Sequence, residues 1–204
     1  MSTILAIDTA SPSFALALRE EGAIVRSLER DSNQDHSRLL LAAIDEITEG
    51  RRAALDGVVV VRGPGSYAGL RVGIATAEGL ALARSIPIAG VGTLEAVARA
   101  CGHDACVAIH PAGRGEYAAQ RFEGGAAVGP TAAVRADELS GTICGEGAGA
   151  LGGPEIGPEQ RCRAALDLGA PLLDGARGRG VEAIYLREPH ISRPGSGKKR
   201  VPGA

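Results

Sequence analysis

The sequence has almost no lysine and few aromatic residues. Its only lysines, Lys198 and Lys199, are adjacent near the carboxyl end, so the other basic residues are all arginines. The rest of the chain therefore offers no lysine for a Schiff base, a phosphate-binding loop or a general base. Aromatic residues make up only 2% of the chain and tryptophan is absent. We expect a core built from alanine, valine, leucine and isoleucine.

The usual metal-binding patterns are also missing. No two histidines are spaced three or four residues apart, and no cysteines form a C-x-x-C pair, which are the spacings that zinc sites favour. Cys101 and Cys106 alone are a weak start for such a site. We therefore predict no metal site, and we expect the cysteines to be buried, reduced thiols. The residues concerned are His36, His103, His110 and His190, with Cys101, Cys106, Cys144 and Cys162.

No hydrophobic run approaches the length of a membrane span. Residues 1–8 lead directly into a strand pattern, without the basic region and apolar stretch of a signal peptide. With 22 basic and 24 acidic residues, the net charge is only −2, so the whole chain offers no strong field to hold nucleic acid. We expect a cytoplasmic protein without a membrane partner, and one that would need another protein to grip RNA.

The first half of the chain has clear secondary-structure signals. Strands are expected at 4–8, 14–19, 23–28, 57–61 and 86–91, and helices from 37, over 69–85 and from an N-cap at Thr93. Residues 57–61 form a β-branched run, which is typical of a strand buried on both faces. Three strands followed by alternating helices and strands predict an α/β fold with a mixed sheet.

The second half is less regular. Strands are expected at 105–109, 116–122 and 142–144, and helices at 135–139 and 159–168. The pattern changes near residues 100–104, which predicts an amino-terminal lobe over 1–102 and a smaller lobe over 103–191. Residues 192–204 combine proline, glycine, serine and basic residues without apolar periodicity, and are expected to form a disordered basic tail.

The most distinctive segment is the glycine-rich run RGPGSYAGLRVG at 62–73. Gly63 and Gly65 permit positive φ or close backbone approach, and Ser66 can cap the following helix. A helix start of this kind can bind an anion through its free N–H groups. It can equally be a structural turn, and both interpretations stay open. A Walker phosphate loop is excluded by the missing lysine, and a G-x-S-x-G nucleophile elbow does not match.

Two further features have open interpretations. Gly69, Gly73 and Ala77 recur every fourth residue, so this helix has a stripe of small residues for internal packing or for a subunit interface. Asp8 and Thr9 end the first strand, where they would hold a Mg²⁺–phosphate group in a sugar-kinase-like lobe. A simple Asx turn is the interpretation that we favour for them.

Five segments together resemble the bacterial TsaB (YeaZ) family in order and spacing. They are the opening strand, His36-Ser37, the segment 61–77, residues 87–91 and residues 93–96. Arg114-Gly115-Glu116-Tyr117 and Tyr185-Leu186-Arg187 resemble two later motifs of the family. The resemblance covers the first 100 residues well and the second half thinly. It implies an actin-like ASKHA (ribonuclease H-like) fold with two lobes of mixed sheet and helices.

The resemblance also implies a function. Such a chain would be a non-catalytic scaffold or activator that pairs with TsaD, joined by TsaE, to form N6-threonylcarbamoyladenosine in tRNAs that read codons beginning with A. It would have no catalytic residues of its own, would contact tRNA indirectly, and would form a homodimer when alone. The alternative is a free-standing ASKHA nucleotide-binding enzyme that resembles a small-molecule kinase.

Two sets of site residues follow from the motifs and the resemblance. Any nucleotide contact, with ADP or ATP at a partner interface, would involve Asp8, Thr9, Gly63, Gly65 and Ser66. The partner interface is expected on helices of the first lobe, at Leu40, Ile44, Gly69, Gly73 and Ala77. No resident cofactor and no metal are expected.

The chain departs from the family's pattern in three places. Tyr67-Ala68 replaces the usual Phe-Thr, and His110 stands where an aspartate is common. The carboxyl-terminal part looks short, so we expect a final helix that closes the first lobe to be missing. These departures bear on nucleotide contact and lobe closure more than on the partner role.

Overall fold

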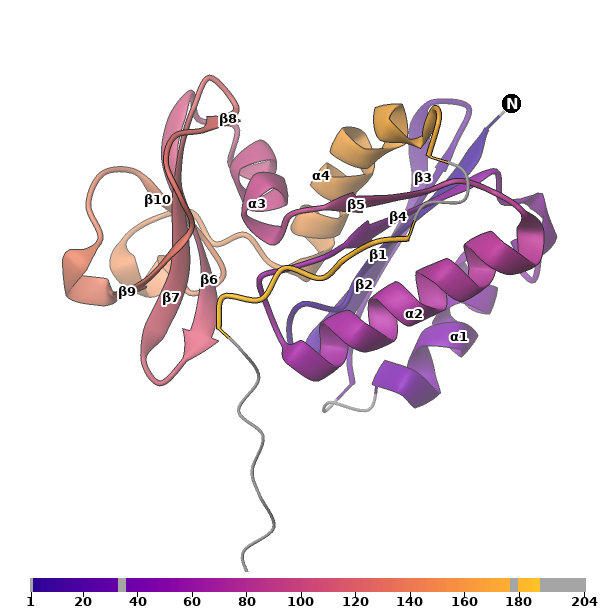
Figure 1. The fold of residues 1–204 in the computed structure, drawn as a ribbon, viewed down its shortest axis with the longest axis horizontal. Coiled ribbons are helices and arrows are strands. Elements are labelled where there is room, and N and C mark those ends of the chain that lie inside the picture. The colour runs from indigo at the N-terminus through magenta and orange to yellow at the C-terminus, as the bar shows by residue number, and fades with distance from the viewer. Residues whose placement is uncertain (1, 33–35, 177–179, 188–204) are drawn as a thin grey trace, which may run out of the picture.

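The structure, a computed structural model, describes residues 2–32, 36–176 and 180–187. It has two mixed β-sheets with helices packed around the first and between the two (Figure 1). The predicted basic tail, 192–204, lies outside the described residues. Among those residues, no helix is long and apolar enough to cross a membrane.

The first sheet has the strand order β3-β2-β1-β4-β5. Its central strand β1 (Thr3–Asp8) pairs antiparallel with β2 (Ser13–Glu20) and parallel with β4 (Gly57–Val61). The flanking strands are β3 (Ala23–Asp31), antiparallel to β2, and β5 (Ile88–Val91), parallel to β4. All five residues of β4 are buried, as its continuous β-branched run predicts for a strand covered on both faces.

Helices cover both faces of this sheet (Figure 1). On one face, α1 (His36–Ile47) and α2 (Tyr67–Arg84) pack against apolar side chains of β1, β2 and β4. On the other face lies α4 (Pro158–Gly169), which contacts the same three strands, and α3 (Thr93–Cys101) packs beside α4. The first sheet is therefore the middle of three layers.

The second sheet has the order β10-β6-β7-β8, and β9 also pairs with β7. Its strands are β6 (Ala105–Gly113), β7 (Glu116–Glu123), β8 (Ala126–Ala127), β9 (Ala132–Arg135) and β10 (Ile143–Gly145). α3 packs against β6, β7 and β10, so it joins the two sheets. Short 3₁₀ turns occupy Arg52–Ala54, Ala136–Glu138, Ala148–Leu151 and Ala170–Leu173.

Most predicted elements are present, with shifted ends. Two local predictions were wrong. The helix expected at 135–139 is only the 3₁₀ turn Ala136–Glu138, because Arg135 belongs to β9. The cap of α3 is Gly92 rather than Thr93, which is the first helical residue; the Gly92 N–H donates to Glu95 Oε2 at 2.9 Å.

The packing divides the chain differently from the predicted lobes 1–102 and 103–191. The second sheet does begin at Ala105, three residues past the predicted boundary. However, α4 comes after the second sheet in the chain and packs on the first sheet, against β1 and β2. Residues 158–169 therefore belong in space with the first lobe, and they provide a helix on its second face.

Candidate functional site

The glycine-rich loop 62–66 lies between the turn after β1 and a returning segment near residue 184. The Ser66 N–H donates to Ala10 O at 2.7 Å, and the Ile184 N–H donates to Arg62 O at 2.7 Å. A third bond joins the Thr93 N–H to Gly63 O at 2.8 Å. The loop is thus held by backbone hydrogen bonds to three distant parts of the chain.

The two glycines of this loop are there because neighbouring backbone comes very close. Gly63 has φ of 110°, and a Cβ added to it would lie under 3.0 Å from the carbonyl oxygen of Ile184. A Cβ on Gly65 would lie 2.7 Å from the Cβ of Ala10. Ser66 caps α2 as predicted, since its Oγ accepts from the Gly69 N–H at 3.3 Å. These contacts are what a structural turn requires.

The small-residue stripe of α2 faces the interior of the chain. A Cβ on Gly69 would overlap Thr9 O, and one on Gly73 would overlap Thr9 Oγ1. Ala77 is fully buried. The stripe therefore lets α2 approach the carboxyl end of β1 closely. Leu40 and Ile44 of α1 are likewise buried in the core between these helices and the sheet.

The five residues predicted for a partner interface thus lie beneath the surface of α1 and α2. A partner that docks on these helices would meet their outward residues, while the five set how the helices sit on the sheet. That α1 and α2 form the interface stays a prediction.

The residues predicted to contact nucleotide are brought together, because the turn after β1 packs against the glycine-rich loop. Asp8 and Thr9 are fully buried there. The Asp8 carboxylate accepts from the Ala10 N–H at 2.9 Å and from Arg161 Nε at 2.6 Å. Thr9 Oγ1 has no hydrogen-bond partner among the described residues and packs on Gly73. The nucleotide contact stays a prediction.

Arg161, in the first turn of α4, is the centre of a polar cluster between the two sheets. It is fully buried, and its guanidinium binds Asp8 from the first sheet and Glu146 from the loop after β10, with Nη1 to Glu146 Oε2 at 3.0 Å. Nη2 donates to Ser11 Oγ at 2.8 Å. Burial disfavours the charged guanidinium, but the carboxylates of Asp8 and Glu146 outweigh this and raise the pKa of Arg161.

His110 of β6 completes the cluster in its neutral form. Burial, reinforced by the charge of Arg161, lowers the pKa of His110 to about 3. Its Nε2 lies 3.2 Å from Ala10 O, and its Nδ1 lies 3.3 Å from Arg161 Nη1. Since a guanidinium only donates, Nδ1 must accept and Nε2 must carry the proton. The ring therefore connects the second sheet to the turn after β1.

In chemical terms this cluster is a set of paired groups. The Asp8 carboxylate and the His110 ring nitrogens all have partners within the chain. The arrangement fixes the two sheets relative to each other. Arg161 was not singled out in the sequence, although it shares a helix face with Ala165 and Leu168 at i+4 and i+7, a position where an exposed arginine is not expected.

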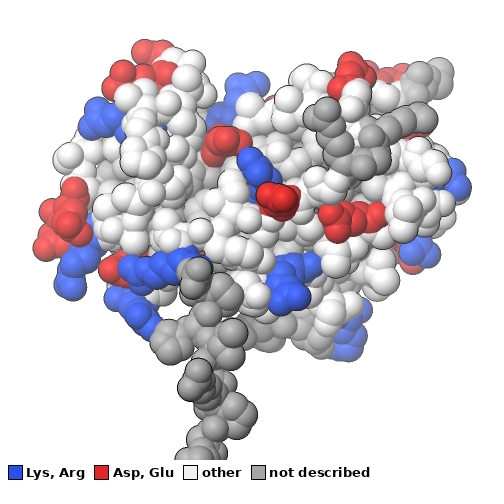
Figure 2. All heavy atoms as spheres, in the orientation of Figure 1, with Lys and Arg blue, Asp and Glu red and all other residues white. Residues whose placement is uncertain are grey.

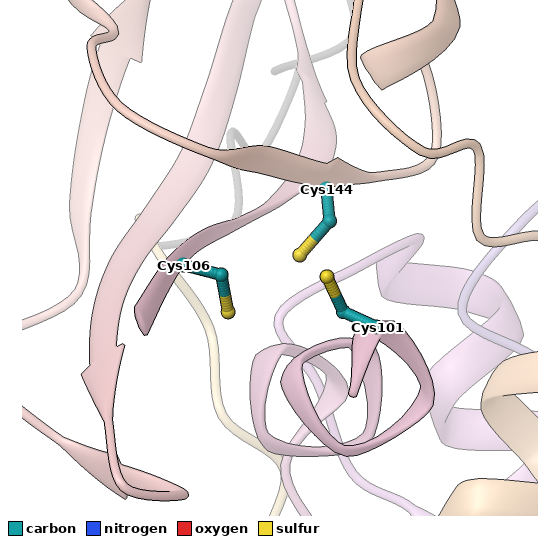
Figure 3. Close-up of side chains that lie close together, drawn as sticks. All are labelled: Cys101, Cys106 and Cys144. Atoms are coloured by element: carbon teal, nitrogen blue, oxygen red, sulfur yellow. The ribbon is translucent and has the colours of Figure 1, made fainter. Parts of the chain in front are cut away.

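Three cysteines also come together between the carboxyl end of α3 and the second sheet. The sulfur atoms of Cys101, Cys106 and Cys144 all lie within 4.8 Å of one another (Figure 3). All three are free thiols, and burial raises the pKa of both Cys106 and Cys144. Sequence spacing brought together only Cys101 and Cys106, because Cys144 lies 38 residues after Cys106 and joins it only through the pairing of β10 with β6.

The cavities near these groups are small. One of about 150 Å³ lies beside the glycine-rich loop, lined by Pro64, Gly65 and Tyr67 and by residues 111–112 and 185–187 among others. It is below the range of roughly 300–1,000 Å³ typical of small-molecule sites. A hollow of about 590 Å³ lies by Ser2, Asp56 and Pro87, before the parallel strands begin. Ligands of open α/β sheets bind instead at the carboxyl ends of the strands.

The fold defines a structural class. A five-stranded mixed sheet of order 3-2-1-4-5, covered by helices on both faces and followed by a second mixed sheet, is the actin-like ASKHA (ribonuclease H-like) architecture that the resemblance to the TsaB family implies. The overlap with a solved YeaZ-like protein from Pseudomonas aeruginosa has a TM-score of 0.74 at 24% identity, covering 92% of this chain and all of the other.

Comparison of sequences identifies the family. A family model described as TsaD, tRNA N6-adenosine threonylcarbamoyltransferase, matches residues 29–142, more than half of the chain. TsaB proteins of tRNA threonylcarbamoyladenosine biosynthesis are 37% identical over 98 residues in Escherichia coli and 35% identical over 99 residues in Bacillus subtilis. The chain therefore belongs to the TsaB/TsaD family.

The extent of these matches differs between relatives. The alignments with the two TsaB proteins span 47% of this chain but only 42% and 43% of the relatives' own lengths. An uncharacterized protein of Mycobacterium tuberculosis H37Rv is 36% identical over 143 residues, which is 67% of each chain. The chain thus spans less than half the length of the TsaB proteins that it matches.

Proposed function

We propose that this chain is a non-catalytic partner subunit in the formation of N6-threonylcarbamoyladenosine in tRNAs that read codons beginning with A. The observation that carries the proposal is its membership of the TsaB/TsaD family together with TsaB relatives at 35–37% identity. In this proposal a TsaD homologue supplies the transfer chemistry and a TsaE homologue joins the pair. The chain works in the cytoplasm, where tRNA is modified.

The polar cluster supports a scaffold role over a kinase-like one. In an ASKHA enzyme, the aspartate at the end of the first strand would have to be free for a Mg²⁺–phosphate group. Here Asp8 is bound by Arg161 and lies fully buried. We therefore propose that the isolated chain has no nucleotide site of its own, and that any ADP or ATP lies at the interface with the partner.

The outward sides of α1 and α2 suit a docking surface. Leu82 of α2 is 84% exposed and Leu41 of α1 is 48% exposed, so each helix presents a large apolar side chain to solvent. On α2, Ala75 and Gly79 are also exposed, so a partner helix can approach closely. We propose that this surface binds the TsaD homologue, and that a second copy of the chain occupies it when TsaD is absent.

The charge distribution supports indirect contact with tRNA. On the face seen in Figure 2, basic and acidic side chains are interspersed over both lobes and form no continuous basic stripe. Nucleic-acid affinity depends mainly on clustered positive charge. The grip on tRNA is therefore assigned to the partner proteins.

Reconstitution tests the proposal. Purified TsaC, TsaD and TsaE are combined with tRNA, threonine, bicarbonate and ATP, with or without this chain, and the modified nucleoside is measured by mass spectrometry. The modification is expected only when the chain is present with TsaD. Transfer by this chain alone would contradict the scaffold role. Micromolar binding of ATP–Mg²⁺ to the isolated chain in calorimetry would favour the kinase-like alternative.

A further inference from the structure

The cysteine cluster brings together three elements that the fold places around one point. Cys101 is the last residue of α3, Cys106 is the second residue of β6, and Cys144 is the middle residue of β10 (Figure 3). Their sulfur atoms lie within 4.8 Å of one another. In Figure 3 the sulfurs of Cys101 and Cys144 point toward each other across the gap between the helix and the sheet.

The register of the second sheet explains the grouping. β10 runs parallel to β6, with Cys144 opposite Ala108. Cys106 lies two residues before Ala108, so its side chain is on the same face of the sheet as those of Ala108 and Cys144. That face packs on α3, which ends at Cys101. Three thiols thus converge although they are spread over 44 positions of the sequence.

The cysteine cluster lies within one of the apolar cores of the chain. The cluster belongs to an apolar core formed by Leu94, Val97, Phe122 and Ile156 together with Cys106 and Cys144. Cys106 and Cys144 are buried, whereas Cys101 is half-buried at the end of the helix. A cation could therefore approach from the side of Cys101 and would find the sulfur ligands in apolar surroundings.

We propose that Cys101, Cys106 and Cys144 form a thiolate site for a soft metal cation, with Zn²⁺ as the fitting ion, which ties α3 to the second sheet. Soft thiolate ligands select zinc, copper(I) or iron–sulfur centres over hard cations. Zn–S bonds of about 2.3 Å put tetrahedral sulfurs roughly 3.8 Å apart, so the three sulfurs need to close by about 1 Å at most.

Charge distinguishes Zn²⁺ from Cu⁺ at this site. Three thiolates with Zn²⁺ leave one net negative charge, whereas three thiolates with Cu⁺ leave two. An apolar environment disfavours the larger charge more strongly. Zn²⁺ also takes a fourth ligand, which is water or the exposed His103 of the connection between Cys101 and Cys106. Binding breaks three S–H bonds, forms three Zn–S bonds and releases up to three protons to the buffer.

The test uses the full chain, reduced and freed of metal by a chelator. Zn²⁺ is titrated against a chromophoric competitor, and proton release is measured by calorimetry in two buffers of different ionisation enthalpy. Co²⁺ replaces Zn²⁺ in a parallel titration, because tetrahedral thiolate coordination gives intense visible and charge-transfer bands. We expect one ion per chain, release of between two and three protons, and those Co²⁺ bands.

Two substitutions make the result specific. Cys101→Ser removes the most accessible ligand with the least disturbance of the core, and we expect at least a 100-fold loss of Zn²⁺ affinity and no Co²⁺ thiolate bands. Cys162→Ser is the matched control, because Cys162 is buried in α4 outside the cluster, with its Sγ donating to Ala15 O. The control should bind as the unchanged chain does. Circular dichroism verifies that both variants are folded.

Two outcomes would overturn the proposal. One is no stoichiometric binding of Zn²⁺ to the reduced, folded chain. The other is binding of equal affinity in Cys101→Ser, which would place the ion at a different surface site. The test is independent of tRNA modification, so the proposed function can fail while the metal site holds, and the reverse.

Discussion

At the scale of single residues, two glycines of α2 have opposite surroundings. Gly73 is buried, and a Cβ there would overlap the Thr9 hydroxyl at the end of β1. Gly79 is exposed, and a Cβ there would meet nothing within 4 Å. The same substitution therefore reports on packing at one position and on helix propensity at the other.

Gly73→Ala is expected to lower the free energy of unfolding by about 1–3 kcal/mol, because the added methyl group forces α2 away from β1. Gly79→Ala, the matched control, should raise it by up to about 1 kcal/mol through better helix propensity. Urea unfolding of both variants followed by circular dichroism measures the difference. Equal effects would show that α2 does not depend on close approach at Gly73.

Arg161 is the residue on which the polar cluster depends. Arg161→Ala leaves the buried Asp8 carboxylate without its counter-ion, and we expect a loss of about 3–5 kcal/mol in unfolding free energy. Arg163→Ala, two positions along the same helix and exposed, should change it by less than about 0.5 kcal/mol.

A double-mutant cycle separates the ion pair from general packing. If Asp8 and Arg161 stabilise each other directly, the Asp8→Ala/Arg161→Ala variant should lose clearly less than the sum of the single variants. Additive losses would mean that each side chain acts by itself, and the view of Arg161 as the link between the sheets would fail.

At the scale of elements, the first half of the chain was predictable because its patterns are local. The β-branched run at 57–61 and the apolar spacing of Leu40, Ile44 and Ile47 each determine an element by themselves, and the structure confirms β4 and α1 there. The turn at 136–138 has no such periodicity, so its helical signal was overestimated.

The site was less predictable, because its contacts are non-local. Arg161 meets Asp8 across 153 positions, and Cys144 reaches Cys106 only through strand pairing. Nor could the sequence show which way the stripe of Gly69, Gly73 and Ala77 faces, since internal packing and a subunit interface need the same small residues. The structure places the stripe inward, against Thr9.

The outward side of α2 is the element-scale test of partner binding. Leu82→Glu places a charge on the proposed docking surface, near the carboxyl end of α2, and burying it against a partner should weaken the affinity for the TsaD homologue at least 10-fold. Leu172→Glu is the control, because Leu172 is 56% exposed in a 3₁₀ turn outside α1 and α2.

Both variants should unfold like the unchanged chain, since neither side chain is in the core. Calorimetry with purified TsaD measures the affinity, and light scattering measures the dimer of the chain alone. Undiminished binding of Leu82→Glu to TsaD would place the interface elsewhere on the chain.

At the scale of the whole molecule, the two sheets are joined by buried polar groups that include one uncharged imidazole. His110 faces Arg161, Glu146 and the carbonyl of Ala10, and its pKa is lowered to about 3 by burial and by the guanidinium. An unfolded histidine titrates near pH 6.5. Between these two values the unfolded chain binds a proton that the folded chain excludes.

Stability should therefore fall as pH falls below about 6.5, by up to about 1.4 kcal/mol for each pH unit, and this contribution to the slope vanishes above that pH. Urea unfolding in buffers from about pH 5 to about pH 8 measures the dependence. His110→Gln keeps a donor for Ala10 O without a titrating group, so its unfolding free energy should depend less on pH in this range. His103→Gln, a histidine substitution at an exposed position outside the polar cluster, is the matched control. If His110→Gln and the unchanged chain show the same slope, a group other than this imidazole governs the pH dependence of the unfolding free energy.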